Sequence, residues 1–437
     1  MDLLFNNPRG ALVLIFVFST FVQCAVGFFK FKNIVNPISI FNILFFLHNW
    51  SYSFGKWLGD ERQWSLPESV SVNTQSDVLL VNLVALWIVF GILLFAKNTN
   101  WGSYSRLKRP SILLFLYLVF TALFIFKTFI IDGIGGVYGE GQAANSIESF
   151  SPIHRLLSLR VIFIAFYAII FGVRKSKILI AVILLEIFIS LLTGGRKALL
   201  IIIISLAIPH LEGLRLNFLK VLKIALVLFV ASYFLIFISV FRGTSVDTDL
   251  VSERLVIAQE KMSNLGENAF YKMLYTANSE GVQNWTYQLL EDEKLEPLMG
   301  RSYLQAFLNM IVLRPFQGEI VNWQAAYYFK DVAYPEVTNH GWDFTFTAEA
   351  MLNWGVKGSF LSYIFLAMFI VYSYRRRNKD DLNRVLYYIT WALLFIHFRT
   401  DSTALLRMYS FVIFSYVIVM LLGGKKNISK KSRSNKF

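Results

Sequence analysis

The chain has very little of the residue types that build metal clusters and disulfides. Only one of its 437 residues is a cysteine, Cys24, so an intramolecular disulfide and a cysteine-rich metal site are both excluded. The five histidines are scattered and show no metal-ligand spacing. The sequence has no Walker motif and no Gly-x-Gly-x-x-Gly, which disfavours an ATP-driven pump. We therefore expect no metal and no cofactor.

Charged residues are also scarce, at 16% of the chain, whereas hydrophobic residues make up 56% and the mean hydropathy is +0.54. Soluble domains are about 45–50% apolar. Apolar runs of roughly 18 residues, the length that spans a bilayer core, recur along the chain. These runs are continuous and do not alternate with polar residues, which disfavours a β-barrel. The composition predicts an all-α polytopic integral membrane protein.

Hydropathy and length predict about eleven spans, within a range of about 10–12. The first follows Arg9 without a small-x-small cleavage site, so we expect a retained helix, not a signal peptide. Spans six and seven are short and are either two tilted helices or a re-entrant pair. The spans lie near residues 11–29, 36–54, 77–96, 111–131, 153–173, 178–192, 198–210, 221–241, 346–374, 383–398 and 402–423.

The net charge of +14 does not require a nucleic-acid partner, because Lys and Arg collect in alternate loops. The positive-inside rule places such loops in the cytoplasm. The N-terminus is then outside and the C-terminus inside. The basic set comprises Lys30 and Lys32; Lys97, Arg106, Lys108 and Arg109; Arg174, Lys175 and Lys177; Arg215 and Lys220; Arg375, Arg376, Arg377 and Lys379; and the tail from Lys425 to Lys436.

We expect a single membrane domain, residues 1–437, with one large outer segment at residues 242–343. That segment is rich in aromatic residues, so a folded cap is favoured over a flexible linker. Helical patterns are predicted at residues 249–274 and, as an amphipathic helix, at residues 303–313. The basic, Ser-rich tail at residues 424–437 is predicted to be a disordered cytoplasmic anchor.

Several cationic residues fall at the predicted outer ends of the spans. Arginines at this depth either snorkel to the interface or bind an anion, and guanidinium suits phosphate because its fixed fork bonds two oxygens. Interfacial anchoring does not require so many of them on one side, which favours an anionic ligand. The set comprises Arg196, Lys197, Arg242, Arg399 and Arg407.

Glu349 stands in an apolar stretch at the start of the ninth span. Desolvation there would raise the pKa of its carboxyl toward the range useful for a general base. The alternative is a structural glutamate bonded by backbone amides at a helix start. His340 and Asp401 are weaker candidates for the base. Downstream, Gly355 and Gly358 predict a broken or closely packed helix. Glu186, in span six, pairs with a loop arginine or belongs to a proton pathway.

Four segments resemble the bacterial oligosaccharide repeat-unit polymerases, the Wzy-type O-antigen and capsule polymerases. Their order and spacing carry the resemblance, which covers most of the chain. The segments are Leu192-Thr193-Gly194-Gly195-Arg196-Lys197-Ala198-Leu199; Arg242-Gly243; Met299-Gly300-Arg301-Ser302-Tyr303 with Leu313-Arg314-Pro315-Phe316; and Thr347-Ala348-Glu349-Ala350-Met351-Leu352-Asn353-Trp354-Gly355-Val356-Lys357-Gly358.

The resemblance implies the multi-span helical architecture of lipid-phosphate-sugar glycosyltransferases, called GT-C-like. It implies polymerisation of undecaprenyl-diphosphate-linked oligosaccharides on the outer face of the bacterial inner membrane, with this lipid as donor and acceptor, and it admits a chain-length regulator as partner. Developing charge on the diphosphate needs cations, and apolar grooves between spans would hold the polyprenyl tails. The expected diphosphate-binding residues are Arg196, Arg242, Arg399, Arg407, Arg314 and Lys197, and the expected sugar-stacking residues are Trp323, Tyr327, Tyr328 and Trp342.

Two other functions are compatible with the sequence. An O-antigen ligase would move a glycan from the same carrier to a different acceptor. A flippase or secondary transporter of lipid-linked or anionic sugars would show inverted repeats and paired broken helices. The sequence shows one predicted break, near Gly355, and one oversized outer segment, and this asymmetry favours the enzyme.

Overall fold

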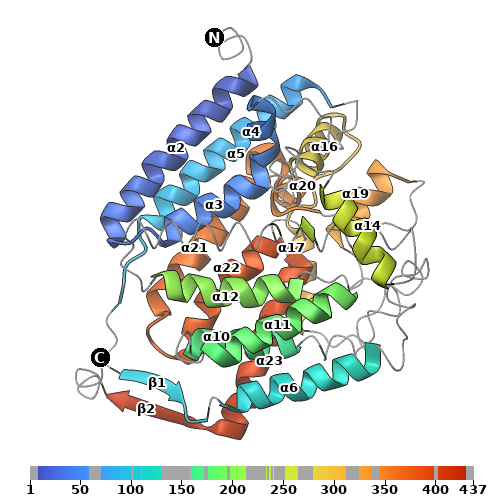
Figure 1. The fold of residues 1–437 in the computed structure, drawn as a ribbon. Helices are drawn as coiled ribbons and strands as arrows, with labels where there is room; N and C mark the ends of the chain where they lie inside the picture. Colours follow the sequence, from blue (N-terminus) through green and yellow to red (C-terminus); the bar gives the residue numbers. More distant parts are fainter. Residues whose placement is uncertain are drawn as a thin grey trace. The chain divides into compact units, whose positions relative to one another are not determined.

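The computed structural model is almost entirely helical, and the part of the chain that it describes contains one two-stranded sheet (Figure 1). This agrees with the prediction of an all-α protein. The structure describes residues 8–58, 70–99, 103–109, 111–128, 157, 159–171, 176–193, 197–212, 233, 236–237, 240, 251–263, 279–311, 324–335, 344–397 and 402–429.

The chain divides into two compact units, each built from three stretches of sequence. The first unit comprises Met1–Thr99, Leu274–Arg376 and Leu393–Ser410, and the second comprises Asn100–Met273, Arg377–Ala392 and Phe411–Phe437. Two helices, α22 (Asp381–His397) and α23 (Ser402–Gly423), contribute residues to both units. Each unit is therefore assembled from segments that are far apart in sequence.

In the first unit, helices from the start of the chain pack with helices from its second half. The long helices α2 and α5 lie side by side with α3 (Figure 1), and α5 also contacts α21 and α16. The helices are α2 (Pro8–Phe31), α3 (Pro37–Asn49), α4 (Ser51–Trp57), α5 (Val72–Leu93), α16 (Glu280–Glu291), α17 (Arg301–Ile311), α19 (Ala325–Ala333), α20 (Phe346–Gly358) and α21 (Phe360–Arg376).

The second unit contains apolar helices and the small sheet. Helix α10 packs against both α6 and α12, and every described side chain from Leu159 to Ile169 is buried, so α10 is a central helix of this unit. The elements are β1 (Ser103–Leu107), α6 (Ser111–Phe126), α10 (Leu159–Phe171), α11 (Ser176–Thr193), α12 (Lys197–Glu212), α14 (Val251–Ser263) and β2 (Lys425–Ser429).

Four described stretches are long and apolar enough to cross a membrane, and a fifth arises if α20 and α21 are taken as one bent span. These five coincide with predicted spans, and shorter apolar helices lie at Pro37–Asn49, Leu159–Phe171 and Leu199–Glu212. The protein is thus a multi-pass membrane protein, and the count of about eleven spans stays a prediction. The four stretches are Arg9–Phe31, Val72–Leu93, Ser111–Thr128 and Leu405–Leu422.

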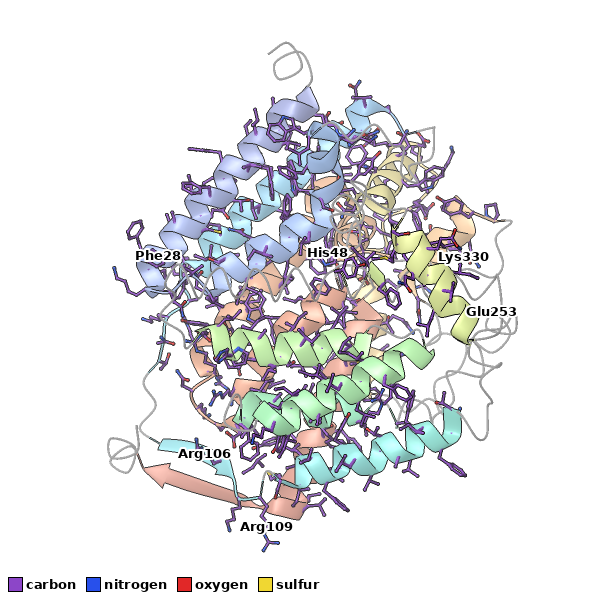
Figure 2. The ribbon with its side chains drawn as sticks, in the orientation of Figure 1. Phe28, His48, Arg106, Arg109, Glu253 and Lys330 are labelled. Atoms are coloured by element: carbon purple, nitrogen blue, oxygen red, sulfur yellow. The ribbon has the colours of Figure 1, made fainter. Side chains whose placement is uncertain are left out.

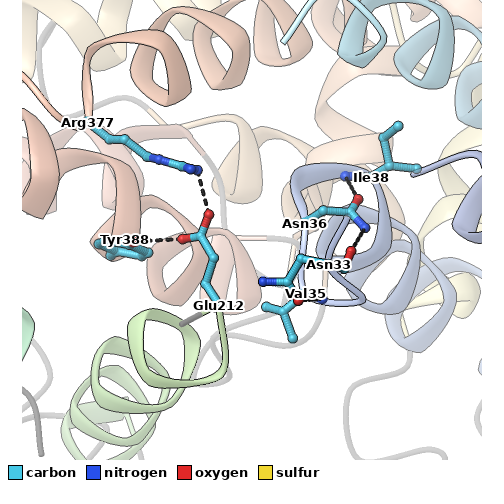
Figure 3. Close-up of polar contacts among 7 residues, drawn as sticks. All are labelled: Asn33, Val35, Asn36, Ile38, Glu212, Arg377 and Tyr388. Atoms are coloured by element: carbon cyan, nitrogen blue, oxygen red, sulfur yellow. Dashed lines mark hydrogen bonds and ion pairs between the residues drawn. The ribbon is translucent and has the colours of Figure 1, made fainter. Parts of the chain in front are cut away.

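Helix α3 shows how polar residues start a helix within the apolar part of the chain. The side-chain oxygen of Asn36 accepts a hydrogen bond from Ile38 N at 3.0 Å (Figure 3). The same oxygen accepts one from Ser39 N at 3.1 Å, and Pro37 occupies the first helical position. The side-chain amide nitrogen of Asn36 donates to Asn33 O at 2.9 Å. Asn36 thus satisfies amides that would otherwise lack partners at the helix start.

The predicted ninth span is not a straight helix. Gly355 has φ 71° and ψ 171°, a conformation that only glycine adopts without strain, and the axes of α20 and α21 differ in direction by 118°. The helix break that the glycines predict is therefore confirmed. The bend leaves α20 as a separate short helix, with Glu349 in its first turn.

The polar segment at residues 242–343 contains four described helices, α14, α16, α17 and α19. Helix α14 matches the helical pattern predicted at residues 249–274, and α17 matches the amphipathic pattern at residues 303–313. The boundary between the two units falls inside the segment, at Leu274. Helix α14 packs against Ile236 and Val240 in the second unit, whereas α16 and α19 share an apolar core with α20 in the first.

Basic connections that are far apart in sequence meet in the second unit. Strand β1 pairs antiparallel with β2, and Leu107 N donates to Asp381 Oδ2 at 2.8 Å. Arg377 forms an ion pair with Glu212 at 2.6 Å, and the hydroxyl of Tyr388 donates to the same carboxylate (Figure 3). Connections that contact one another lie on the same side of the membrane, so an even number of spans must separate them along the chain. The predicted order of spans meets this condition.

Part of the basic tail is a strand. Residues Lys425–Ser429 form β2, because their backbone pairs with that of β1. The prediction of a disordered tail is therefore wrong for this stretch. Residues 430–437 lie outside the described part. Arg106 lies in β1 and Arg109 lies just after it, and both are exposed (Figure 2).

A tight turn fits the start of α17 against α20. Met299 and Gly300 have φ values of 49° and 83°, and Leu298 N donates to Leu352 O at 2.8 Å. A Cβ added at Gly300 would lie 2.6 Å from the ring of Trp354. Both the left-handed backbone and the close ring therefore require glycine at this position.

We expect Gly300→Ala to lower the apparent melting temperature of the detergent-solubilised protein by about 5 °C, because a left-handed alanine costs about 1–2 kcal/mol and the methyl group must displace Trp354. Gly91→Ala is the matched control. Gly91 lies inside α5 with no heavy atom within 4 Å of an added Cβ, so this change should leave stability equal or raised. Equal effects of the two substitutions would contradict the packing described here.

Candidate functional site

The carboxylate of Glu349 lies at the junction of three helices of the first unit. Glu349 is 1% exposed. Its Oε1 accepts hydrogen bonds from the hydroxyls of Ser302 and Ser402, both at 2.6 Å, and its Oε2 accepts one from Ser402 N at 2.7 Å. Helices α17, α20 and α23 are therefore joined through one side chain.

The position of Glu349 follows from local helix chemistry. Thr345 caps α20 by accepting a hydrogen bond from Ala348 N at 3.1 Å, which places Glu349 in the first turn. Ser402 is the first residue of α23, so its amide has no partner within its own helix. A carboxylate near two helix N-termini is stabilised by the positive ends of both helix dipoles.

Asn353, one turn after Glu349, holds Ser302 in place. Its Nδ2 donates to Ser302 Oγ at 2.7 Å and to Glu349 O at 2.8 Å, and its Oδ1 accepts from Ser302 N at 3.3 Å. With Asn353 Nδ2 as donor, the hydroxyl proton of Ser302 is directed at Glu349. The predicted glutamate and asparagine motif thus forms one hydrogen-bonded unit with Ser302.

The neighbouring aromatic residues fix the start of α17 on the bend between α20 and α21. The hydroxyls of Tyr303 and Ser362 are hydrogen-bonded at 2.8 Å, and Trp354 Nε1 donates to Ser362 Oγ at 3.0 Å. The rings of Tyr303 and Trp354 stack, with centroids 6.3 Å apart. Burial raises the pKa of Tyr303 well above its ordinary value, so its hydroxyl stays neutral.

A second buried polar network supports the other end of α20. Asn49 Oδ1 accepts hydrogen bonds from Gln283 Nε2 at 2.7 Å and from Thr347 Oγ1 at 2.8 Å. Gln283 in turn accepts from Asn82 at 2.9 Å, and the hydroxyls of Thr347 and Tyr363 are hydrogen-bonded. Helices α3, α5, α16, α20 and α21 are tied together by these bonds. Such a fully buried network favours a single arrangement of the helices.

The described residues include only some of the predicted site residues. Glu349 is at the centre of the hydrogen-bonded cluster that it forms with Ser302, Asn353 and Ser402. Arg407 lies in α23 and is half-buried. Lys197 begins α12 in the second unit. The candidates that lie outside the described residues are His340, Asp401, Arg196, Arg242, Arg399, Arg314, Trp323 and Trp342.

The two described aromatic candidates on α19 differ in exposure. Tyr327 is 46% exposed, which leaves its ring accessible. Tyr328 packs against the apolar core shared by α16, α19 and α20, and its hydroxyl accepts a hydrogen bond from Glu296 N at 3.4 Å. The ring of Tyr328 therefore contributes to the packing of this core, and its role as a sugar-stacking residue stays a prediction.

Glu186 forms an ion pair with an arginine, which was one of the two roles predicted for it. Arg160 of α10 pairs with its Oε1, and the Tyr117 hydroxyl donates to the same atom at 2.9 Å. Arg160 lies in a helix and not in a loop, and both charged residues are buried. A buried charge needs a partner of this kind.

Among the described residues, no group of three His, Cys, Asp or Glu side chains has the arrangement of a metal site.

Sequence reasoning missed another buried carboxylate, Glu280, at the start of α16. It accepts hydrogen bonds from Tyr52 N at 2.8 Å and from the Ser53 hydroxyl at 2.6 Å, and so attaches the polar segment to α4. Loss of hydration on burial raises its pKa to about 7, against the lowering effects of Ser53 and Arg9. Ser402 was also missed, because no local pattern marks it.

The family model for the O-antigen polysaccharide polymerase Wzy matches residues 2–432, which is nearly the whole chain. A search of curated proteins found no match. A search of solved structures also found none. The family match includes all three helices that meet at Glu349.

We expect Asn353→Asp to destabilise the first unit, because it removes two hydrogen-bond donors and adds a negative charge beside Glu349. Loss of buried donors costs about 1–3 kcal/mol each. The apparent melting temperature in detergent measures the effect, and Asn378→Asp, at an exposed position after α21, is the matched control. A variant as stable as the control would show that Asn353 does not carry the cluster.

Glu280 should make stability fall as pH rises. Its folded-state pKa of about 7 lies above the ordinary value of 4.5, so its contribution is fully present below pH 4.5 and is lost between pH 4.5 and 7. The apparent melting temperature of the wild type should therefore decrease across this window, and Glu280→Gln should flatten the decrease. An identical pH profile in the variant would contradict the raised pKa.

Proposed function

The chain belongs to the O-antigen polysaccharide polymerase Wzy family, and from this membership we propose its reaction and the residues that carry it. The family polymerises lipid-linked oligosaccharide repeat units, which makes the protein a polymerase of the glycosyltransferase type. We propose that the donor is an undecaprenyl-diphosphate-linked oligosaccharide. The growing glycan would be transferred to the next lipid-linked unit on the outer face of the inner membrane.

The observation that carries the site assignment is the buried Glu349 carboxylate with its two serine donors. Glycosyl transfer breaks the bond between the anomeric carbon and the diphosphate oxygen, and forms a bond from that carbon to an acceptor hydroxyl. The acceptor proton must then leave, and a carboxylate in a water-poor site can take it. Glu349 is such a carboxylate in the described part of the chain, and it belongs to the segment that resembles the family motif.

Because Glu349 is almost completely buried, the proton would reach it through a serine hydroxyl. Ser302 or Ser402 would accept the proton of the sugar hydroxyl and pass its own to Oε1, over the 2.6 Å hydrogen bond already in place. The serine is unchanged at the end, and Glu349 holds the proton. This relay refines the direct role that the sequence suggested for Glu349.

The leaving diphosphate would be stabilised by cations, which need no metal ion to act. Arg407 is on α23, the helix whose first residue binds Glu349, about 1.4 turns further along. We propose the same role for Arg196, Arg242, Arg399, Arg314 and Lys197, and sugar stacking for Tyr327, Trp323 and Trp342, with Asp401 and His340 as further proton acceptors. In this proposal the N-terminus is outside and the basic connections are cytoplasmic, in keeping with their contacts in the second unit.

We expect Glu349→Gln to reduce chain polymerisation by at least about 100-fold, because a general base contributes about 10²–10⁴-fold to the rate. The length distribution of the polysaccharide on a gel, together with the amount of protein in the membrane, measures this. Glu291→Gln, at an exposed position of α16, is the control. Wild-type ladders from Glu349→Gln would refute the assignment.

Arg407→Ala should likewise lower polymerisation, and Arg407→Lys should restore part of it, because the cation is kept and its two-pronged geometry is lost. Reconstitution of the purified protein with a lipid-linked repeat unit tests both variants directly. Movement of the lipid across the bilayer without formation of polymer would instead favour a transporter.

A further inference from the structure

The bend between α20 and α21 exposes a lysine that the proposed reaction does not use. Lys357 lies two residues after Gly355 and is exposed. In the described part of the chain it makes no hydrogen bond or ion pair, and no heavy atom lies within 4 Å of a Cβ added at Gly355. Lys357 is thus exposed just after the break at Gly355, on the other side of that break from Glu349.

An apolar stripe begins at the same bend and runs along α21. Its members recur at helical spacing, with exposed fractions of 37% for Leu361, 58% for Phe365, 46% for Met368 and 52% for Tyr372. The stripe is about 16 Å long, from the helical rise over eleven residues. The opposite face of α21 is buried in the first unit. The stripe is therefore a surface for apolar chains.

Helix α17 extends the same combination of charge and apolar surface. Its first residue, Arg301, is exposed, and so are Leu304 at 60% and Phe307 at 48%. Its inner face instead carries Ser302, which binds Glu349. The hydrogen bond between Tyr303 and Ser362 joins the start of α17 to the start of the α21 stripe. Both exposed faces thus begin next to the Glu349 cluster.

A cation followed by a long apolar surface matches an amphiphile with an anionic head and a long hydrocarbon tail. Phosphate oxygens suit an ammonium group as a point charge, and each buried methylene adds about 0.8 kcal/mol. A phospholipid and a polyprenyl diphosphate share this chemistry. The surface begins at the helix that carries Glu349, where the donor's diphosphate must lie during the proposed reaction, and this favours the polyprenyl diphosphate.

We propose that the bend between α20 and α21 is the docking site for the lipid part of the donor: Lys357 binds a diphosphate oxygen, and the polyprenyl chain lies along Leu361, Phe365 and Met368. This inference rests on the proposed function. It adds a binding residue, Lys357, and a place for the tail.

Equilibrium binding of labelled undecaprenyl diphosphate, without sugar, to the full-length protein in phosphatidylcholine nanodiscs tests the proposal. We expect Lys357→Gln to weaken binding about ten-fold, as the loss of a charged hydrogen bond predicts, and Lys357→Arg to bind like wild type. Phe365→Ser should also weaken binding. Uncharged undecaprenol should be affected by Phe365→Ser and not by Lys357→Gln.

The matched controls are Lys108→Gln, at another exposed lysine, and Phe115→Ser, at an α6 residue that is 64% exposed. Wild-type affinity in both test variants would overturn the proposal, and so would equal losses in the controls, which would indicate general lipid contact. Polymerisation of a lipid-linked repeat unit is measured in parallel. Binding that depends on Lys357 without polymer formation would refute the proposed function alone, whereas polymerisation with unchanged binding in the variants would refute the docking site alone.

Discussion

The arrangement of the first unit depends on keeping one carboxylate out of water. An isolated buried charge is very costly, so Glu349 can remain only where donors surround it. Ser302 and Ser402 come from segments a hundred residues apart, and both are required at the same point. The charge therefore specifies how α17, α20 and α23 meet. The same requirement that orders the helices also creates a dry, hydrogen-bonded group suited to proton transfer.

The second determinant is the break at Gly355. A straight span would keep its backbone hydrogen bonds and present a uniform apolar surface to lipid. The bend instead turns α20 into a short helix held from both ends, by Asn49 through Thr347 and by Ser362 through Trp354. Broken helices in membrane proteins commonly line the sites where polar substrates are handled. Here the break brings a buried carboxylate and an exposed ammonium into one short segment.

Much of the fold could be predicted from local sequence. Apolar run length predicted the membrane-spanning helices at Val72–Leu93 and Leu405–Leu422, and glycine chemistry predicted the break at Gly355. Glu349 stood out because a charge in an apolar run is unusual. The buried contacts of Ser402, Asn49 and Glu280 could not be predicted, because a hydrogen bond between distant segments leaves no periodic pattern. The strand at Lys425–Ser429 was missed for the same reason: it pairs with β1, more than 300 residues earlier.

That strand pairing also constrains the order of assembly. Residues Ser103–Leu107 are synthesised early, and their hydrogen-bonding edge finds Lys425–Ser429 only after every helix between them has been made. Closing so long a loop brings a large entropic cost and cannot start folding, so the ladder must form late. The β1–β2 pair therefore forms only once α23 is in position. In a ribosome-bound chain in which Lys425–Ser429 has not yet been synthesised, this strand pair cannot have formed.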